Sequence, residues 1–379
     1  YVGDTTQVES ITYPNGTVEQ YGYNDRGQLT SMTQKDGTAV SFEYDSNGDL
    51  VKSTDASGAV RTYAYDDRGY IASSTDALGN TTTYTCDDMG NILTETDPLG
   101  NTTTYEYNGK GYLVKQTSPL GHSYTYEYSE AGKLVTETDP LGNTRTTEYN
   151  GNGFETSISD WQGNKTLYTY NAVNDLTSMT DPTGATTTYA YDGQGNLIST
   201  TDAGGHTTTS TYDALGRMTS RTDANGNTTS FSYDANGNLT VETDPYGHTF
   251  TTGYDSMDQA VSETNERGLT TSYERDAMGR ITKMTDARGN SISYGYDANG
   301  NLTSVTDGRG NTTSYTYDAE NKLTAITDPE GGVTTLSYDA AGQLTGVTDA
   351  NGASGQISYD ADGNSTAAVD GLGYTTGYE

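Results

Sequence analysis

The sequence predicts an all-β protein built from tandem 21-residue β-hairpin repeats. Three observations predict it: a Tyr that recurs once in every repeat, a Gly that recurs at another phase of the same period, and two turn motifs in each unit. A fixed period of this length is typical of repeat architectures, in which each unit buries its face only against its neighbours. We therefore expect a single continuous array of about 18 repeats over residues 1–379, without separate domains.

The composition by itself resembles that of a disordered acidic chain. Leu, Ile, Val and Phe make up about 13% of the 379 residues, and the formal net charge is −33, a combination that disfavours an ordinary globular core. The 33 Tyr residues oppose this interpretation, because disordered chains contain few aromatic residues and because Tyr and Thr favour strands.

The charge and the hydropathy pattern exclude several classes of function. Binding of nucleic acid or of an anionic membrane requires clustered Lys and Arg, whereas 52 acidic residues here face 19 basic ones. No apolar run reaches the length of a transmembrane helix. The single Cys86 permits no internal disulfide.

The Tyr period defines the repeat. Among the positions reached in steps of 21 from Tyr23, fifteen of seventeen are Tyr, and the exceptions are Cys86 and Arg275. A typical unit runs from Tyr233 to Gly253 and reads YDANGNLTVETDPYGHTFTTG. Because Cys86 occupies a Tyr position, we interpret it as a small apolar residue rather than a reactive thiol.

One turn of each unit, the second turn, carries the motif Asp-Pro-x-Gly. Its Gly occurs at every repeat from Gly16 to Gly373, and all seven Pro residues lie two places before it. Asp at i, Pro at i+1 and Gly at i+3 are typical of a type I turn. We expect this Gly to adopt a positive φ and to begin the returning strand, as in a bulged hairpin.

The first turn lies ten residues upstream, in the segment Tyr-Asp-x-x-Gly. Its Gly is replaced only by Asn174, Asp258 and Asn321, which are the residue types that best tolerate the left-handed region. This substitution pattern predicts a left-handed backbone at that position.

The segments between the turns have the length and composition of strands. One runs from Asn301 to Thr306 and the other from Asn311 to Tyr317, and no helical period is present. We expect Tyr317 to lie near Tyr296 and Tyr338 in an aromatic ladder. Since strands twist, a sheet of some 36 strands should coil into a hollow spiral shell, a tube or a barrel-like solenoid.

The residues that could carry chemistry follow the repeat. His122, His206 and His248 all come directly after the second-turn Gly, where Asn is usual, and we interpret them as polar turn residues. Asp97 and Asp307 stand at the start of second turns, where Asp caps backbone N–H groups, so we favour capping over acid–base catalysis.

Two further patterns suggest binding only weakly. The segments that begin at Asp234 and Asp297 resemble the start of a calcium loop but lack its bidentate Glu, which leaves weak calcium binding as an alternative to a simple turn. Trp161 replaces Pro in a second turn, where we expect it to be exposed. We therefore assign no catalytic, cofactor-binding or metal-binding residue and expect no cofactor.

The motif Tyr-Asp-x-x-Gly-Asn-Leu-Thr, followed by Thr-Asp-Pro-x-Gly-Asn-Thr-Thr-x-Tyr-x-Tyr, resembles the Rhs/YD-repeat family over essentially the whole chain. The family includes Rhs polymorphic toxins, insecticidal toxin-complex subunits and teneurins. The resemblance implies a large β-shell that, in the bacterial toxins, encloses a carboxyl-terminal effector domain. It also implies a secreted or cell-surface bacterial protein that is not an enzyme.

Two departures from the family pattern leave a second function open. The chain contains no closing core segment and no effector domain; Asp139 to Gly142 is an ordinary repeat turn. Because the chain starts at Tyr1 and ends within a repeat at Glu379, we expect an internal fragment of a longer protein. The alternative is a segment of a long extracellular tube or adhesin with a cell-surface or carbohydrate partner. In both cases the nearest partners are neighbouring repeats and further segments of the same protein.

Overall fold

The computed structural model describes residues 7–378, in which all regular secondary structure is β-strand. The predicted all-β class and the tandem hairpins are therefore confirmed. Short and long strands alternate along the chain, and each long strand ends at the Tyr position of a repeat. The first and last strands are β1 (Ser10–Thr12) and β36 (Thr375–Gly377).

The short strands have five residues each. They are β3 (Leu29–Thr33), β5 (Leu50–Thr54), β7 (Ile71–Thr75), β9 (Ile92–Thr96), β11 (Leu113–Thr117), β13 (Leu134–Thr138), β15 (Glu155–Ser159), β17 (Leu176–Thr180), β19 (Leu197–Thr201), β21 (Met218–Thr222), β23 (Leu239–Thr243), β25 (Ala260–Thr264), β27 (Ile281–Thr285), β29 (Leu302–Thr306), β31 (Leu323–Thr327), β33 (Leu344–Thr348) and β35 (Ser365–Val369).

The long strands have six residues each. They are β2 (Val18–Tyr23), β4 (Ala39–Tyr44), β6 (Val60–Tyr65), β8 (Thr81–Cys86), β10 (Thr102–Tyr107), β12 (Ser123–Tyr128), β14 (Thr144–Tyr149), β16 (Lys165–Tyr170), β18 (Thr186–Tyr191), β20 (Thr207–Tyr212), β22 (Thr228–Tyr233), β24 (Thr249–Tyr254), β26 (Thr270–Arg275), β28 (Ser291–Tyr296), β30 (Thr312–Tyr317), β32 (Val333–Tyr338) and β34 (Ser354–Tyr359).

Both kinds of strand are one residue shorter than the sequence predicts. Asn301 and Asn311, the expected first residues of two strands, belong to the turns instead. The carbonyl of Asn301 accepts a hydrogen bond from the Asp297 N–H, and its side-chain amide donates to Asp297 Oδ2 at 2.9 Å. A residue that closes a turn with both its backbone and its side chain is held outside the strand ladder.

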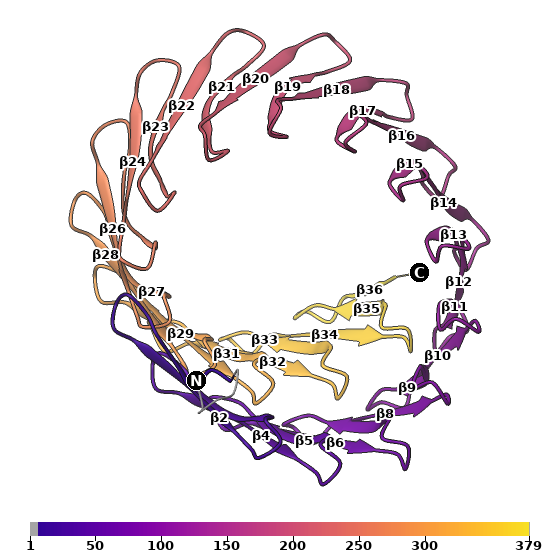
Figure 1. The fold of residues 1–379 in the computed structure, drawn as a ribbon. Helices are drawn as coiled ribbons and strands as arrows, with labels where there is room; N and C mark the ends of the chain where they lie inside the picture. The colour runs from indigo at the N-terminus through magenta and orange to yellow at the C-terminus, as the bar shows by residue number, and fades with distance from the viewer. Residues whose placement is uncertain (1–6, 379) are drawn as a thin grey trace. The chain divides into compact units, whose positions relative to one another are not determined.

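The described chain forms two compact units. The first unit contains residues 7–105, 117–121 and 271–378, and the second contains residues 106–116 and 122–270. In the first unit, β1 to β9 and β27 to β36 form two runs in which each strand pairs antiparallel with the next. In the second unit, β12 to β25 pair in the same way. Figure 1 shows this order along the chain, from hairpin to neighbouring hairpin.

A β-bulge accompanies the first turn of each repeat. Tyr315 lies opposite Ile326, but Tyr317 lies opposite Leu323, so the short strand accommodates one extra residue, Thr324, opposite the step from Thr316 to Tyr317. The same shift recurs beside the first turn in other hairpins of both units. The bulge predicted at the second turn is also present: the Asp307 carbonyl accepts the Gly310 N–H, the Asp307 N–H donates to the Asn311 carbonyl oxygen, and Gly310 has a φ of 89°, so one residue lies opposite two. A bulge increases the local twist, and its recurrence adds the same twist in every repeat.

The sheet has no fully buried apolar side chain within the described residues. Most side chains of the short strands are half-buried on both faces, whereas the long strands alternate between exposed and half-buried positions. A single layer of hairpins gives each side chain neighbours on the same face only, so burial stays partial. Strand pairing and turn hydrogen bonds must therefore contribute much of the stability that a globular core supplies elsewhere.

Candidate functional site: turns, tyrosine ladder and seam

The Asp of each turn is a cap for the backbone. In the first turn that begins at Asp234, Oδ1 accepts the N–H groups of Asn236 and Asn238 at 3.0 and 2.8 Å, and Oδ2 accepts the Asn238 side-chain amide at 3.0 Å. Asp97 and Asp307 make the corresponding bonds in second turns. The capping role predicted for Asp is confirmed, and it accounts for the abundance of Asp without a paired catalytic carboxylate.

The left-handed position is also confirmed in both turns. Gly247 in a second turn has a φ of 85°, and Asn174, Asp258 and Asn321 in first turns have φ values of 71°, 58° and 61°. These three are the non-Gly residues with positive φ among the described residues. The substitution pattern in the sequence predicts the same three positions.

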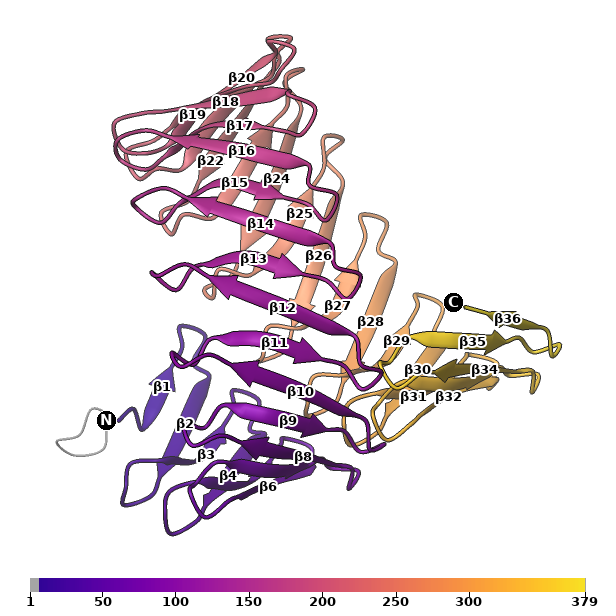
Figure 2. The same ribbon diagram turned by 90° about the vertical axis from the view of Figure 1, so that its right-hand side faces the viewer.

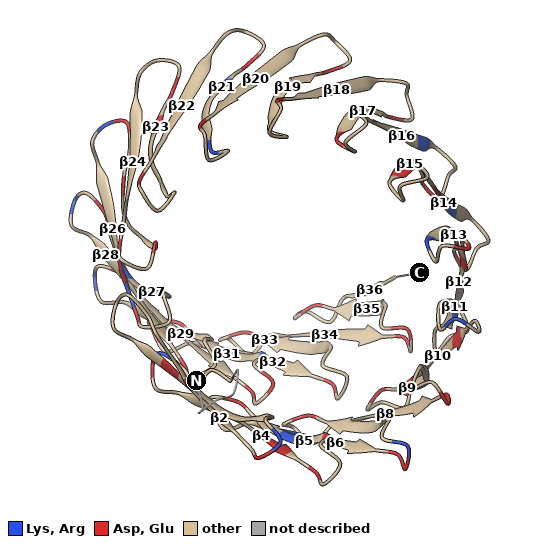
Figure 3. Cartoon of the chain, in the orientation of Figure 1, with Lys and Arg blue, Asp and Glu red and all other residues tan. Residues whose placement is uncertain are grey.

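The capping bonds favour the ionised form of the carboxyl group in some of the turns. Hydrogen bonds from the Asn238 side chain and backbone hold the pKa of Asp234 below its ordinary value, and Asn311 does the same for the pKa of Asp307. Figure 3 shows Asp and Glu gathered at the turns of the hairpins. Much of the negative charge of the chain therefore lies in the turns, at the two ends of the strands.

Two of the three His residues replace Asn in this cap. His206 Nδ1 lies 2.9 Å from Asp202 Oδ2, and His248 Nδ1 lies 2.8 Å from Asp244 Oδ2, which is the contact that the Asn amide makes in other repeats. Both side chains are exposed. His122 occupies the same position after its turn Gly. Their interpretation as polar turn residues fits this geometry.

Cys86 and Trp161 also follow the repeat. Cys86 ends β8 in the Tyr position, and its Sγ lies 3.7 Å from the Ile71 carbonyl oxygen. Burial raises the pKa of the Cys86 thiol, which disfavours the reactive thiolate. The prediction that Trp161 is exposed is wrong. Trp161 is half-buried, because the guanidinium of Arg145 lies 5.4 Å from the centre of its ring.

A ladder of Tyr hydroxyl groups links successive repeats. The hydroxyl of Tyr317 donates to the Leu302 carbonyl oxygen at 2.9 Å, fifteen residues earlier in the chain. The same bond is made by the following residues: Tyr23, Tyr44, Tyr65, Tyr128, Tyr149, Tyr170, Tyr212, Tyr233, Tyr254, Tyr296, Tyr338 and Tyr359. The predicted Tyr ladder therefore exists, but hydroxyl-to-carbonyl bonds hold it and not contact between successive Tyr rings.

A second ladder uses the residue that follows each first-turn Gly. The guanidinium of Arg217 lies 4.8 Å from the centre of the Tyr233 ring and donates to the Asp234 carbonyl oxygen at 3.1 Å. Arg280 makes the same two contacts with Tyr296 and Asp297. In these repeats a cationic side chain thereby covers the Tyr of the next repeat.

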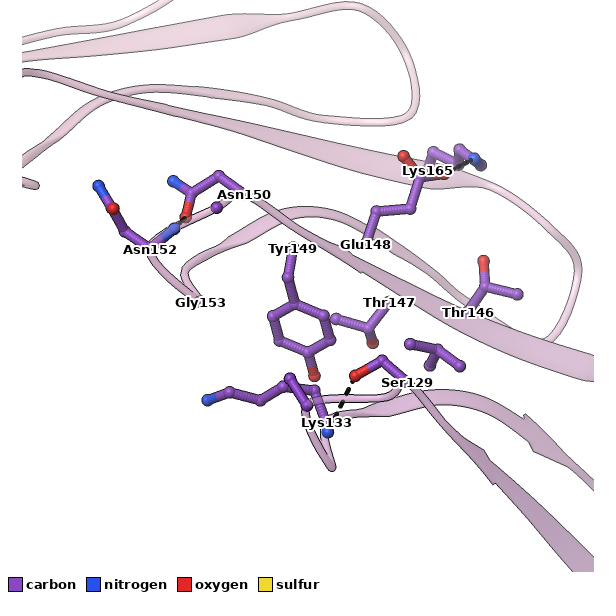
Figure 4. Close-up of a pocket in the computed structure, with 13 residues that line it drawn as sticks. Ser129, Lys133, Thr146, Thr147, Glu148, Tyr149, Asn150, Asn152, Gly153 and Lys165 are labelled. Carbon is purple, nitrogen blue, oxygen red and sulfur yellow. Dashed lines mark hydrogen bonds and ion pairs between the residues drawn. The ribbon is translucent and has the colours of Figure 1, made fainter.

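The second unit contains a groove of about 900 Å³, shown in Figure 4. Ser129, Lys133, Glu148, Tyr149 and Lys165 are among the residues that line it. Lys165 pairs with Glu148 at 2.7 Å, the backbone N–H of Lys133 donates to Ser129 Oγ, and the Tyr149 hydroxyl donates to the Leu134 carbonyl oxygen. These contacts belong to the repeat, so the groove is a gap between hairpins and has no set of converging catalytic groups.

Neither metal ligands nor membrane-spanning helices are present in residues 7–378. No group of three or more His, Cys, Asp or Glu side chains there has the geometry of a metal site. Asp297, at the start of a calcium-loop-like segment, uses its carboxylate to accept hydrogen bonds from Asn299 and Asn301 of its own turn. Within the same residues no helix has the length and apolar character needed to cross a bilayer.

The first unit contains one arrangement that the period does not predict. First turns of its carboxyl-terminal run, residues 271–378, contact second turns of its amino-terminal run, residues 7–105 and 117–121. We call this line of contacts the seam. Figures 1 and 2 show the two runs of this unit side by side.

Three residues at the third position of first turns make most of the seam. Asn299 exchanges hydrogen bonds with Asp55 and Ser57, with its amide 2.8 Å from Asp55 Oδ2. Glu320 accepts the Ala77 N–H at 2.7 Å and pairs with Arg61. Asp362 accepts the Leu120 N–H at 2.8 Å and the Ser118 hydroxyl at 2.6 Å.

The seam residues have a constant separation in the sequence. The hydrogen-bonded pairs between turns are 242 to 244 residues apart, and an ion pair between Asp36 and Arg280 at 3.6 Å extends the series. Only 9% of the Glu320 side chain is exposed. The repeat period predicts none of these contacts, because a contact between turns so distant in the chain leaves no local signal in one sequence.

Fold, turns and ladders together define a class of structural repeat protein, in which similar hairpins pair in sequence order. The RHS Repeat family profile matches residues 170–208, 191–227, 212–249, 254–291, 296–333 and 317–354, and the Teneurin YD-shell profile matches residues 5–152. The chain belongs to the Rhs/YD-repeat family.

Two solved structures share the fold of this chain. The crystal structure of TcdB2-TccC3-TEV has a TM-score of 0.59 and 17% identity over 94% of this chain and 23% of its own. That of TcdB2-TccC3 without hypervariable C-terminal region has the same TM-score and identity over 94% of this chain and 22% of its own. The chain thus spans under a quarter of these two chains that it resembles. Comparison with curated protein sequences gives no match.

Proposed function

We propose that the chain is a wall segment of a hollow β-shell that resembles the encapsulating shell of Rhs-type secreted toxins. The observation that carries the proposal is the seam, because it joins the turns of two runs of hairpins that are distant in sequence. When the turns of one run of hairpins dock onto the turns of another run, the two runs can build a continuous wall. Without such contacts, an array of hairpins remains an open strip.

The related structures support a wall that surrounds another polypeptide. They share the name TcdB2-TccC3 and carry TEV, carry Cdc42, or lack a hypervariable C-terminal region. We propose by analogy that the partners of this chain are further segments of the same protein and an enclosed effector domain. On the same analogy the protein is secreted or extracellular and bacterial.

The wall itself performs no catalysis under this proposal. The His, Cys and Asp side chains are used in turns and ladders, as described above, and a role as container requires shape and stability only. The acidic residues of the turns also disfavour attachment to nucleic acid or to anionic lipid.

A tubular fibre or adhesin is the second candidate. It is favoured by the unbroken 21-residue step, which contains no insertion from Tyr23 to Tyr359 and could propagate without limit. Electron microscopy of the purified chain separates the two. Hollow particles of limited length support the shell, and long uniform tubes contradict it.

A further inference from the structure

The seam pairs turns that match in hydrogen-bonding capacity. We propose that the third residue of the first turn is a docking residue, matched position by position to the second turn 242 to 244 residues earlier, so that the two runs join in one register only. This recognition between first and second turns goes beyond the proposed function, because it applies equally to a wall that encloses an effector domain and to a tube.

Where the second turn offers donors, the docking residue is an acceptor. The turn of Asp76 has Ala77 in place of the usual Pro and therefore has an N–H at i+1, which Glu320 accepts. The turn of Ser118 has Ser in place of Asp, and Asp362 accepts both the Ser118 hydroxyl and the Leu120 N–H.

The turn of Asp55 is matched by a residue that both donates and accepts. The Ser57 N–H is shared between Asp55 Oδ1 at 3.0 Å and Asn299 Oδ1 at 3.1 Å, while the Asn299 amide donates to Asp55 Oδ2 and to Ser57 Oγ. A carboxylate at this position would face Asp55 without a proton to share. The choice of Asn over Asp or Glu therefore agrees with the acceptor that the facing turn presents.

Where the second turn has Pro at i+1 and its own Asp caps the next N–H, the docking residue has no acceptor. In the turn of Asp97, Pro98 has no N–H, and the Leu99 N–H already donates to Asp97 Oδ1 at 2.9 Å. The facing docking residue is Ala341, which lines the same cavity as Pro98. An acidic side chain here would be desolvated without a partner, which is costly.

The four docking positions differ in their hydrogen-bonding groups, as selective docking requires. They are Asn299, Glu320, Ala341 and Asp362. A shift of one repeat would place Glu320 against Pro98 or Ala341 against the N–H of Ala77, and either shift would leave polar groups unpaired. Because an unsatisfied buried polar group costs more than a made bond contributes, even a few mismatches would exclude the wrong register.

Disulfide trapping tests the register directly. In a Cys86→Ser background, the pair Leu99→Cys with Ala341→Cys joins two positions that share the separation of the seam pairs and leaves the polar docking contacts intact. We expect rapid cross-linking, read by mass spectrometry of the linked peptides. The control pair Leu78→Cys with Ala341→Cys is one repeat out of register and should cross-link at least about tenfold more slowly.

The docking residues are then tested in the cross-linking background. Glu320→Ala and Asp362→Ala should each lower the rate of disulfide formation by about tenfold, the effect of losing a charge-assisted hydrogen bond. Glu320→Gln keeps an acceptor and should have a smaller effect. Glu330→Ala removes an exposed acid of a neighbouring second turn and should leave the rate unchanged.

The proposal is overturned by either of two results. One is equal cross-linking of the two cysteine pairs, which would mean that the runs slide past each other. The other is equal rates for Glu320→Ala, Asp362→Ala and Glu330→Ala while circular dichroism shows the native sheet in all three. Neither result depends on the presence of an effector domain, so the shell proposal is tested separately.

Discussion

Second turns that lie at the seam in the first unit and second turns of the second unit have the same backbone but different surroundings. Leu78, Leu99 and Leu120, at the tips of second turns in the first unit, are 49 to 50% exposed, whereas Leu141 at the same position in the second unit is 88% exposed. Their following Gly residues have φ values between 86° and 92°. The turn conformation is therefore a local property of each repeat, while the burial of its tip depends on what docks against it.

The largest difference between the units should come from a change in a docked turn. Gly79 in the first unit and Gly247 in the second have φ values of 87° and 85°, with open space where a Cβ would lie. Gly79→Val and Gly247→Val should each cost about 1–3 kcal/mol of local strain. We expect Gly79→Val also to release the Ala77 contact with Glu320.

Hydrogen exchange and limited proteolysis measure both substitutions. Gly247→Val should increase exchange only around its own turn, because stability in repeat arrays is largely a nearest-neighbour property. Gly79→Val should increase it at its own turn and around Glu320. Unchanged exchange at both turns would contradict the left-handed assignment.

Removal of a docking side chain should have the next largest effect. Glu320→Ala leaves Arg61 and the Ala77 N–H without this partner and should destabilise the first unit by about 1–3 kcal/mol. Gln194 occupies the corresponding turn position in the second unit and is exposed, so Gln194→Ala should change the free energy of unfolding by less than about 0.5 kcal/mol. Urea unfolding gives both values, and equal effects would argue against a stabilising seam.

The Tyr ladder should not distinguish the units. Tyr317 in the first unit and Tyr233 in the second donate to carbonyl oxygens at 2.9 and 2.8 Å. Tyr317→Phe and Tyr233→Phe should each cost about 0.5–1.5 kcal/mol, the usual contribution of one hydrogen bond. Local exchange rates test this expectation, and a clear difference between the two variants would show that the ladder also depends on docking.

Acid should weaken the turn caps of both units. Burial raises the pKa of Asp55, but hydrogen bonds from Ser57, Ala59 and Asn299 outweigh it and hold the pKa below 3.8; in the second unit, bonds from Asn238 lower the pKa of Asp234. Because the folded pKa lies below the unfolded one, the stabilisation is complete above the unfolded pKa and is lost as pH falls through the folded pKa.

Carbon-detected NMR titration of the carboxyl groups measures this effect. Both titration midpoints should lie below 3.8, the ordinary value for Asp. Asn299→Ala should raise the midpoint of Asp55 and leave that of Asp234 unchanged. Equal movement of the two midpoints would show that the docking bond does not reach Asp55.

The smallest effect should come from exchanging His and Asn after second turns. His248 in the second unit and Asn311 in the first make the same contact with a turn Asp, at 2.8 Å in both cases. His248→Asn and Asn311→His should each change the free energy of unfolding by less than about 0.5 kcal/mol. A larger change in thermal unfolding would indicate a role for His248 beyond the cap.

Much of the local structure could be predicted from the repeat. The left-handed backbone at Asn174, Asp258 and Asn321 follows from the residue types that replace Gly there, and the capping role of Asp97 follows from its place in the turn. The bulge at the second turn follows from its left-handed Gly. The register shift beside the first turn is not predicted, because a turn motif restricts φ and ψ but does not state where the strand pairing shifts. The half-burial of Trp161 depends on its contact with Arg145 of β14, a residue that the period alone does not specify.

The sequence by itself determined the hairpin, its two turns and the order of the strands, because those features depend on residues within one repeat or its nearest neighbour. Only the tertiary structure decided the Tyr hydroxyl bonds to the preceding repeat and the seam between Glu320 and the turn of Asp76. The physical reason is that every second turn looks alike locally, and only the returning chain determines which of them becomes a binding surface.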